Sequence, residues 1–106
     1  MKVMPTQRDT ATVIALSEDY VSMEGFSVFY RFLANGDGGK DRFLITARLG
    51  EEECQVGCGL DLELAWSFYK RIVAGGVTPI SLRDIWEDFF YEYGNVKKSL
   101  YNSENL

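Results

Sequence analysis

The chain has 106 residues, of which 46% are hydrophobic, 14% are aromatic and 25% are charged, and its formal net charge is -5 at pH 7. These proportions are typical of one globular domain, because a chain of this length buries about 65% of its unfolded surface in a single core. Its acidic balance and scattered basic residues argue against nucleic acid or an anionic membrane as a partner, since such binding depends on clustered positive charge.

No apolar run is long enough to cross a membrane, and residues 1–10 lack the apolar segment of a signal peptide. We therefore expect the protein to reside in the cytoplasm. We also expect residues 1–106 to form one domain, in which residues 1–9 and 95–106 are loosely ordered.

Alternating β-forming residues predict strands in the first half of the chain. Polar residues 17–19 are expected to end the first strand. The glycine-rich residues 35–41 predict a hairpin, and residues 50–52 predict a second turn. Neighbouring strands joined by short turns predict a four-stranded antiparallel meander. The strands are residues 10–16, 26–34, 43–49 and a run from about residue 53 to near Cys58.

Two amphipathic helices are predicted to follow the strands. Asp61 is expected to cap a helix over residues 62–73, in which apolar residues recur at spacings of three and four before two glycines end it. Ser81 and Asp84 are expected to form the capping box of a second helix that ends at Gly94. Its apolar stripe consists of Leu82, Ile85, Trp86, Phe89, Phe90 and Tyr93. This order predicts an α+β fold in which the meander packs on both helices.

Several motifs that carry chemistry are incomplete in this sequence. Residues 36–40 (GDGGK) lack the hydroxyl residue and the following helix of a phosphate-binding loop, and the spacing does not fit a calcium loop. Cys54 and Cys58 are too far apart on a strand for a disulfide, and we expect both to pack in the core. The chain has no histidine, which removes the usual general base. We therefore predict no catalytic residues, metal or cofactor.

An acidic ridge, defined as Asp84, Asp88 and Glu92, is predicted along one side of the second helix. Like charges four residues apart repel each other unless positive charge lies nearby. Two interpretations remain open: Lys70 and Arg71 neutralise the ridge from the preceding helix, or a basic partner protein docks there.

An apolar patch is predicted on the sheet face that the helices leave open. If alternate residues of the second strand face the helices, then Phe29, Leu33 and Leu44 lie on the opposite face. Large apolar residues gathered on a surface often bind a partner or a second copy. We predict a protein interface there.

Residues 77–89 (VTPISLRDIWEDF) resemble the C-terminal signature of a family of small uncharacterised bacterial proteins, mostly from Firmicutes. The strand, acidic turn and helix before it are similar too, so the resemblance covers roughly residues 26 to 90. The family has no assigned activity, cofactor or catalytic residues, and the resemblance implies a bacterial origin and a domain of unknown function.

Two functional hypotheses follow from the sequence. The first is a non-enzymatic interaction module that binds a protein partner or itself as a homodimer. The alternative is a small-ligand-binding domain or a carboxylate-dependent enzyme, with a pocket between sheet and helices lined by Tyr30, Tyr69 and Trp86. The simpler interpretation of these three aromatic residues is that they only fill the hydrophobic core.

Overall fold

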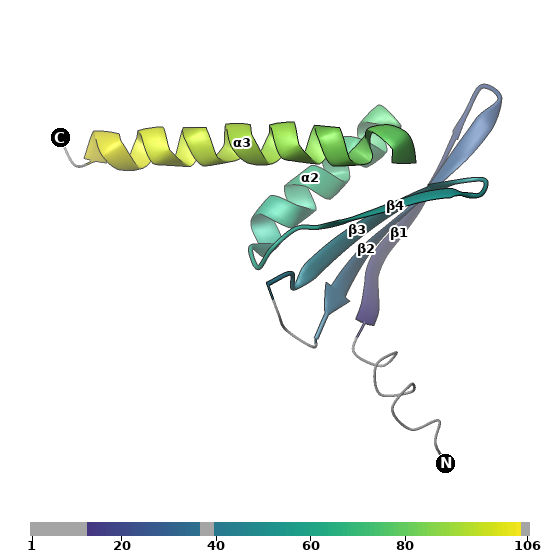
Figure 1. The fold of residues 1–106 in the computed structure, drawn as a ribbon, viewed down its shortest axis with the longest axis horizontal. Coiled ribbons are helices and arrows are strands. Elements are labelled where there is room, and N and C mark those ends of the chain that lie inside the picture. The colour runs from purple at the N-terminus through teal and green to yellow at the C-terminus, as the bar shows by residue number, and fades with distance from the viewer. Residues whose placement is uncertain (1–12, 37–39, 105–106) are drawn as a thin grey trace, which may run out of the picture.

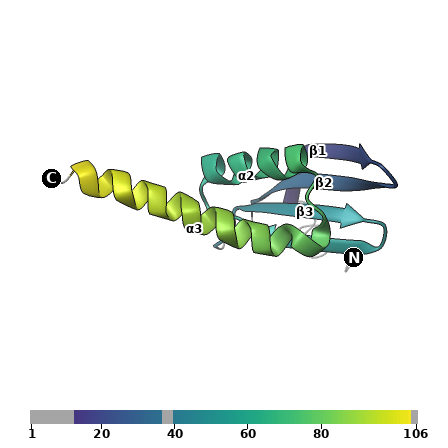
Figure 2. The same ribbon diagram turned by 90° about the horizontal axis from the view of Figure 1, so that it is seen from above.

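The computed structural model describes residues 13–36 and 40–104, with side chains as far as Tyr93. Four strands form an antiparallel sheet in the order β1-β2-β3-β4, and two helices follow them (Figure 1). Both helices lie on the same face of the sheet, so the predicted α+β fold with a four-stranded meander is confirmed (Figure 2). The elements are β1 Val13–Met23, β2 Phe26–Asn35, β3 Phe43–Leu49, β4 Glu52–Gly57, α2 Leu62–Gly75 and α3 Pro79–Glu104.

The strand β1 is longer than predicted. Polar residues 17–19 do not end it, because each has a partner that keeps the strand extended. The Glu18 carboxylate lies 3.2 Å from the Arg31 guanidinium on β2, and the Asp19 carboxylate accepts a hydrogen bond from the Tyr69 hydroxyl at 2.8 Å. A bulge between Ala15 and Ser17 shifts the register of β1 against β2. The predicted start, residues 10–12, lies outside the described residues.

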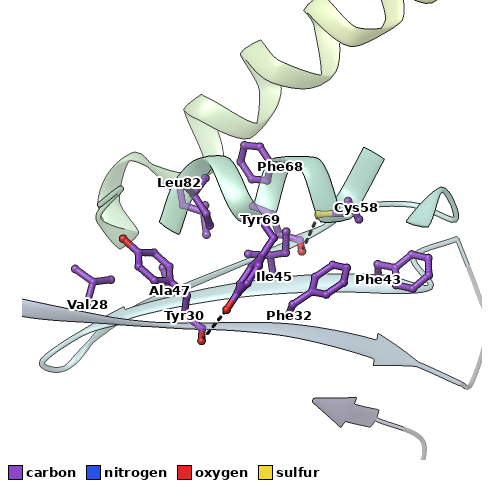
Figure 3. Close-up of a cluster of buried hydrophobic side chains, with 13 residues drawn as sticks. Val28, Tyr30, Phe32, Phe43, Ile45, Ala47, Cys58, Phe68, Tyr69 and Leu82 are labelled. Atoms are coloured by element: carbon purple, nitrogen blue, oxygen red, sulfur yellow. Dashed lines mark hydrogen bonds between the residues drawn. The ribbon is translucent and has the colours of Figure 1, made fainter. Parts of the chain in front are cut away.

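The core lies between the sheet and the helices (Figure 3). Alternate residues of β2 and β3 point into it, so that Tyr30 and Ile45 are fully buried against Phe68 and Ile72 of α2. Four large aromatic and aliphatic side chains of this kind each contribute about 1.5 to 3 kcal/mol when removed from water. The sheet and α2 are therefore held together mainly by apolar packing.

The helix α2 begins and ends as the sequence predicts. The Asp61 side chain accepts a hydrogen bond from the backbone N–H of Leu64 at 3.2 Å, which satisfies one of the free donors of the first turn. Gly76 adopts a left-handed conformation with φ of 63°, and its N–H bonds to carbonyls of the last turn. Glycine suits this position because a side chain there would be strained.

The helix α3 begins earlier and ends later than predicted. It starts at Pro79 rather than after Ser81, because proline already has a helical φ and needs no hydrogen-bond donor in the first turn. Ser81 lies inside that turn, and its N–H donates to the carbonyl of Thr78. Gly94 does not stop the helix, since one glycine costs a helix only about 1 kcal/mol. Residues 95–104 continue α3, and residues 1–9 lie outside the described residues.

Candidate interaction surface

The strand β1 lies at an edge of the sheet that the helices do not cover. The helix α2 contacts β2 and β3, and α3 contacts β3 and β4. Figure 2 shows the two helices side by side, with α3 on the β4 side of α2. Among the described strands, β1 pairs only with β2. Its outer row of backbone N–H and C=O groups is therefore available to another strand.

An apolar groove runs beside this edge, between β1 and the first two turns of α2. The groove has a volume of about 450 Å³, and we call it the edge groove. Trp66 forms one wall, with its ring 5.5 Å from that of Phe32 and 5.6 Å from that of Tyr69. The groove is lined by Leu16, Phe32, Leu62, Glu63 and Trp66.

Exposed apolar side chains concentrate around the edge groove. Ile14 is 59% exposed, Leu62 is 54% exposed and Leu16 is 50% exposed, and Val13 and Trp66 are also exposed. Isolated exposed apolar residues are normal on a protein surface, but four of these five lie on the helix side of the sheet beside the groove, and such a group is typical of a binding site. Val13, which is opposite Asn35 in the register, lies on the other face of the sheet.

Local sequence explains how the edge groove forms. The bulge in β1 makes Leu16 an extra residue, so its side chain is turned toward Phe32. The Asp61 cap sets the start of α2, which places Leu62 and Trp66 four residues apart on one side of the helix. The groove thus depends on one irregularity in a strand and on one helix cap.

The Tyr69 hydroxyl fastens β1 to the helix layer. It donates to the Asp19 carboxylate at 2.8 Å and lies 3.3 Å from the carbonyl oxygen of Tyr30, which Figure 3 shows as a dashed line. Burial is the main reason that the pKa of Tyr69 is raised above its usual value, and the neighbouring Asp19 charge adds to the shift. Tyr69 is therefore a neutral donor over the physiological pH range.

The opposite edge of the sheet is protected. The strand β4 has six residues, and the acidic run from Glu51 to Glu53 spans the end of the preceding turn and the first two residues of the strand. Arg83 of α3 donates to the backbone carbonyl of Gln55 at 3.2 Å, and α3 packs along β4. Short length, charge and a covering helix are the features that prevent a sheet edge from pairing.

The predicted interface on the open sheet face is less apolar than expected. Phe29, Leu33 and Leu44 do lie on that face, and Leu33 is opposite Leu44 in the register. However, Leu33 is only 5% exposed, and Phe29 and Leu44 are half-buried. The guanidinium of Arg48 lies 5.9 Å from the centre of the Phe29 ring. Polar side chains thus interrupt the patch, and an interface there stays a prediction.

The acidic ridge is exposed on α3, and one of the two predicted neutralising residues lies near it, because Arg71 and Glu92 line the same small pocket. Asp84, Asp88 and Glu92 are all exposed. The Arg71 guanidinium lies 5.5 Å from the centre of the Phe89 ring, and the Lys70 ammonium lies over the Trp66 ring. Within residues 13–36 and 40–93, the ion pair of Arg31 with Glu18 is the one within 4.0 Å. Docking of a basic partner on the ridge stays a prediction.

A cleft of about 650 Å³ lies below α3, where this helix passes the connection between β4 and α2. Trp86, Phe90 and Tyr93 line it from α3, and the Asp41 and Asp61 side chains line it from the loops. The sequence-based pocket of Tyr30, Tyr69 and Trp86 is only partly correct. Tyr30 is fully buried and Tyr69 is 1% exposed, so these two belong to the core and Trp86 alone reaches the cleft.

The surroundings of Asp41 and the two cysteines indicate structural roles. The Asp41 carboxylate accepts a hydrogen bond from the Gly59 N–H at 2.9 Å. Both cysteines are free; Cys58 is fully buried, as predicted, whereas Cys54 is only partly buried. Burial, with a smaller contribution from the Asp41 charge, raises the pKa of the Cys58 thiol to about 12. A thiol with this pKa is protonated and unreactive at neutral pH.

In the part of the chain that the structure describes, no three His, Cys, Asp or Glu side chains are grouped to hold a metal ion. Over the same residues, no helix has the length and apolar character needed to span a membrane.

Comparisons with known proteins add no relatives. No family model matches the chain, and no curated protein or solved structure is similar enough to match it. The resemblance of residues 77–89 to a Firmicutes family therefore stays a prediction.

Sequence reasoning missed the edge groove, although a pattern pointed to it. Residues 11–16 are apolar at nearly every position, so both sides of this strand carry apolar residues. A strand of this kind is usually covered on both faces. Because β1 is an edge strand, this pattern leaves apolar side chains of β1 exposed.

Proposed function

We propose that this chain is a small non-enzymatic protein-interaction module, which binds a protein partner or itself through the edge of β1. The observation that carries the proposal is an eleven-residue strand whose outer edge is unpaired among the described residues and which lies beside the exposed apolar side chains of Ile14, Leu16, Leu62 and Trp66. A protein strand that adds to such an edge gains backbone hydrogen bonds, and its side chains fill the neighbouring groove.

The chemistry of the described residues supports a role in binding. Cys58 is held as a neutral thiol, and the Asp41 and Asp61 carboxylates each accept a hydrogen bond from a backbone N–H. These groups have structural partners, and histidine is absent from the whole sequence. The proposal needs neither a cofactor nor a metal.

Native mass spectrometry of the protein purified from its own host tests this function. The expected result is a complex of fixed stoichiometry, containing either two copies or a second protein. A Leu16→Arg variant should lose the complex, because an arginine in the edge groove removes apolar contact and adds charge. A Tyr91→Arg variant is the matched control, since Tyr91 is 71% exposed on α3 and lies away from β1. A bare monomer in the wild-type sample would contradict the proposal.

The second candidate is a small-ligand-binding domain or a carboxylate-dependent enzyme that uses the cleft below α3. Its supporting observation is a cleft volume of about 650 Å³, which falls within the range of small-molecule sites. The same native mass spectrum tests it, because a retained ligand adds mass to the monomer. A Trp86→Ala variant should lose such an adduct, whereas Leu16→Arg should keep it.

The proposal includes cytoplasmic residence. It also takes the partner to be a protein, not nucleic acid or a membrane. The two free cysteines support a reducing compartment, where thiols stay unpaired. The net charge of -5 supports the choice of partner, because it repels phosphate groups.

A further inference from the structure

We infer that the cleft below α3 binds a small organic cation, whose ammonium group is held by the Asp41 carboxylate and whose apolar body lies against the aromatic rings of α3. This inference rests on the second candidate function and names its ligand class, and it does not depend on pairing through β1. The cleft has a volume of about 650 Å³, which is enough for a ligand of the size of an arylalkylamine.

One wall of the cleft is aromatic. Trp86, Phe90 and Tyr93 follow one another at spacings of four and three residues, which places them on one side of α3. The ring centres of Trp86 and Phe90 lie 5.4 Å apart, and the Trp86 ring also packs on Phe68 of α2 at 5.0 Å. Phe90 is 54% exposed, so a ligand can reach its ring. The faces of aromatic rings are electrically negative and attract a cation within about 6 Å.

The opposite wall is negatively charged. Among the described residues, the charged side chains that line the cleft are Asp41 and Asp61. The Asp61 carboxylate caps α2, where the partial positive charge at the start of the helix offsets its own charge. The Asp41 carboxylate accepts a hydrogen bond from the Gly59 N–H at 2.9 Å, and in the described part of the chain no lysine or arginine nitrogen lies within 4.0 Å of it. Asp41 therefore has lone pairs and negative charge to offer a cation.

The loop around Asp41 keeps its charge at the cleft. Gly57 leaves room for the Asp41 carboxylate, because a side chain at this position would collide with it. Cys58 also lines the cleft, and the Asp41 charge contributes, after burial, to the raised pKa of its thiol. The Asp41 charge thus acts on other groups of the cleft. Because charges attract more strongly where water is partly excluded, an ammonium group gains more there than in solution, and a carboxylate is repelled.

An NMR titration of the unmodified protein with three small probes tests the ligand class. The probes 2-phenylethylammonium, 2-phenylethanol and 3-phenylpropionate share a phenylethyl group and differ in charge. We expect the ammonium probe to bind at least about tenfold more tightly than the alcohol, with shifts centred on Gly59 and the Trp86 indole. We expect no binding of the carboxylate. Absence of ammonium binding, or equal affinity for the ammonium and the alcohol, would overturn the inference.

Two variants then test the role of the Asp41 charge. Asp41→Asn removes the charge and keeps an oxygen that accepts from the Gly59 N–H. We expect the dissociation constant of the ammonium probe to rise at least about fivefold in this variant. Glu87→Gln is the matched control, since it also removes one negative charge, and Glu87 is exposed on α3 outside the described lining of the cleft. Equal effects of the two substitutions would contradict the assigned role of Asp41. The comparison of the three probes needs no variant and decides the ligand class even where Asp41→Asn does not fold.

The results separate this inference from the functions proposed above. Leu16→Arg should leave binding of the ammonium probe unchanged, so failure of the interaction module does not affect the cleft. If the host protein retains a neutral or anionic small molecule that Trp86→Ala loses, and the ammonium probe does not bind, the second candidate function stands and the ligand class is wrong. If neither the host sample nor the probes give a bound ligand, both are wrong.

Discussion

Replacing Tyr69 with phenylalanine isolates the contact that fastens β1 to the helices. The substitution keeps the ring in the core and removes only the hydroxyl, which donates to Asp19 at 2.8 Å and lies 3.3 Å from the Tyr30 carbonyl oxygen. A hydrogen bond to a charged group stabilises a protein by about 1.5 to 3 kcal/mol. We therefore expect the free energy of unfolding to fall by about 2 kcal/mol, from a total of about 5 to 15 kcal/mol for a domain of this size.

Urea denaturation followed by tryptophan fluorescence measures this loss, since Trp66 and Trp86 both pack against aromatic residues of α2. A Tyr20→Phe variant is the control, because Tyr20 is 69% exposed, and its free energy of unfolding should change by less than about 0.5 kcal/mol. An Asp19→Ala variant and the double variant complete a thermodynamic cycle, in which we expect a coupling energy of at least about 1 kcal/mol. Equal stability of Tyr69→Phe and Tyr20→Phe would show that the hydrogen bond from Tyr69 to Asp19 does not stabilise the fold.

Three further predictions concern the loop before α2 and its neighbours. A Gly57→Ala substitution should reduce the free energy of unfolding by about 1 to 3 kcal/mol in urea titrations, because the new methyl group collides with the Asp41 carboxylate. Gly75→Ala should be neutral or stabilising, because a methyl group there makes only an ordinary contact with the Val77 side chain, and a loss of equal size would contradict this reasoning. Iodoacetamide should label Cys54 and spare Cys58 in the folded protein at pH 8, as read by peptide mass spectrometry; rapid labelling of Cys58 would show that the thiol is not buried. Because the pKa of Cys58 is about 12 in the folded state and about 9 when unfolded, stability is retained below pH 9 and falls as the pH rises toward 12. Thermal unfolding should show a shallower fall in a Cys58→Ala variant, and identical slopes would refute this contribution.

Local signals explain which parts of the fold could be predicted. Asp61 and Gly76 act on the backbone within a few residues of themselves, so the start and end of α2 follow from sequence. The end of β1 does not, because residues 17–19 are stabilised by Arg31 and Tyr69, which are distant in sequence. The predicted start of α3 is wrong for a different reason. Pro79 and Ser81 are both residues that commonly begin a helix, and they are two positions apart. In the structure Pro79 forms the first turn.

The candidate site was harder to predict because exposure depends on how elements pack. The alternation of β2 places Phe29 and Leu33 on one face, but it does not reveal that Leu33 is covered. Aromatic residues at helical spacing look alike in a core and in a pocket, and only packing separates Tyr69 from Trp86. The edge groove depends on the position of β1 at the edge of the sheet, where α2 contacts it through Tyr69 but leaves Ile14 and Leu16 exposed.

The difference between the two edges of the sheet also limits the size of any assembly. A β-sheet with two unpaired edges can add further molecules at both edges and grow into a fibre. Here β4 is covered by acidic residues, by Arg83 and by α3, so the proposed pairing through β1 gives each molecule a single joining site. When two molecules pair through β1, both β1 edges are occupied and only the covered β4 edges remain at the surface. If molecules pair through β1 as proposed, the sheet therefore stops growing at two copies, even when the protein is concentrated.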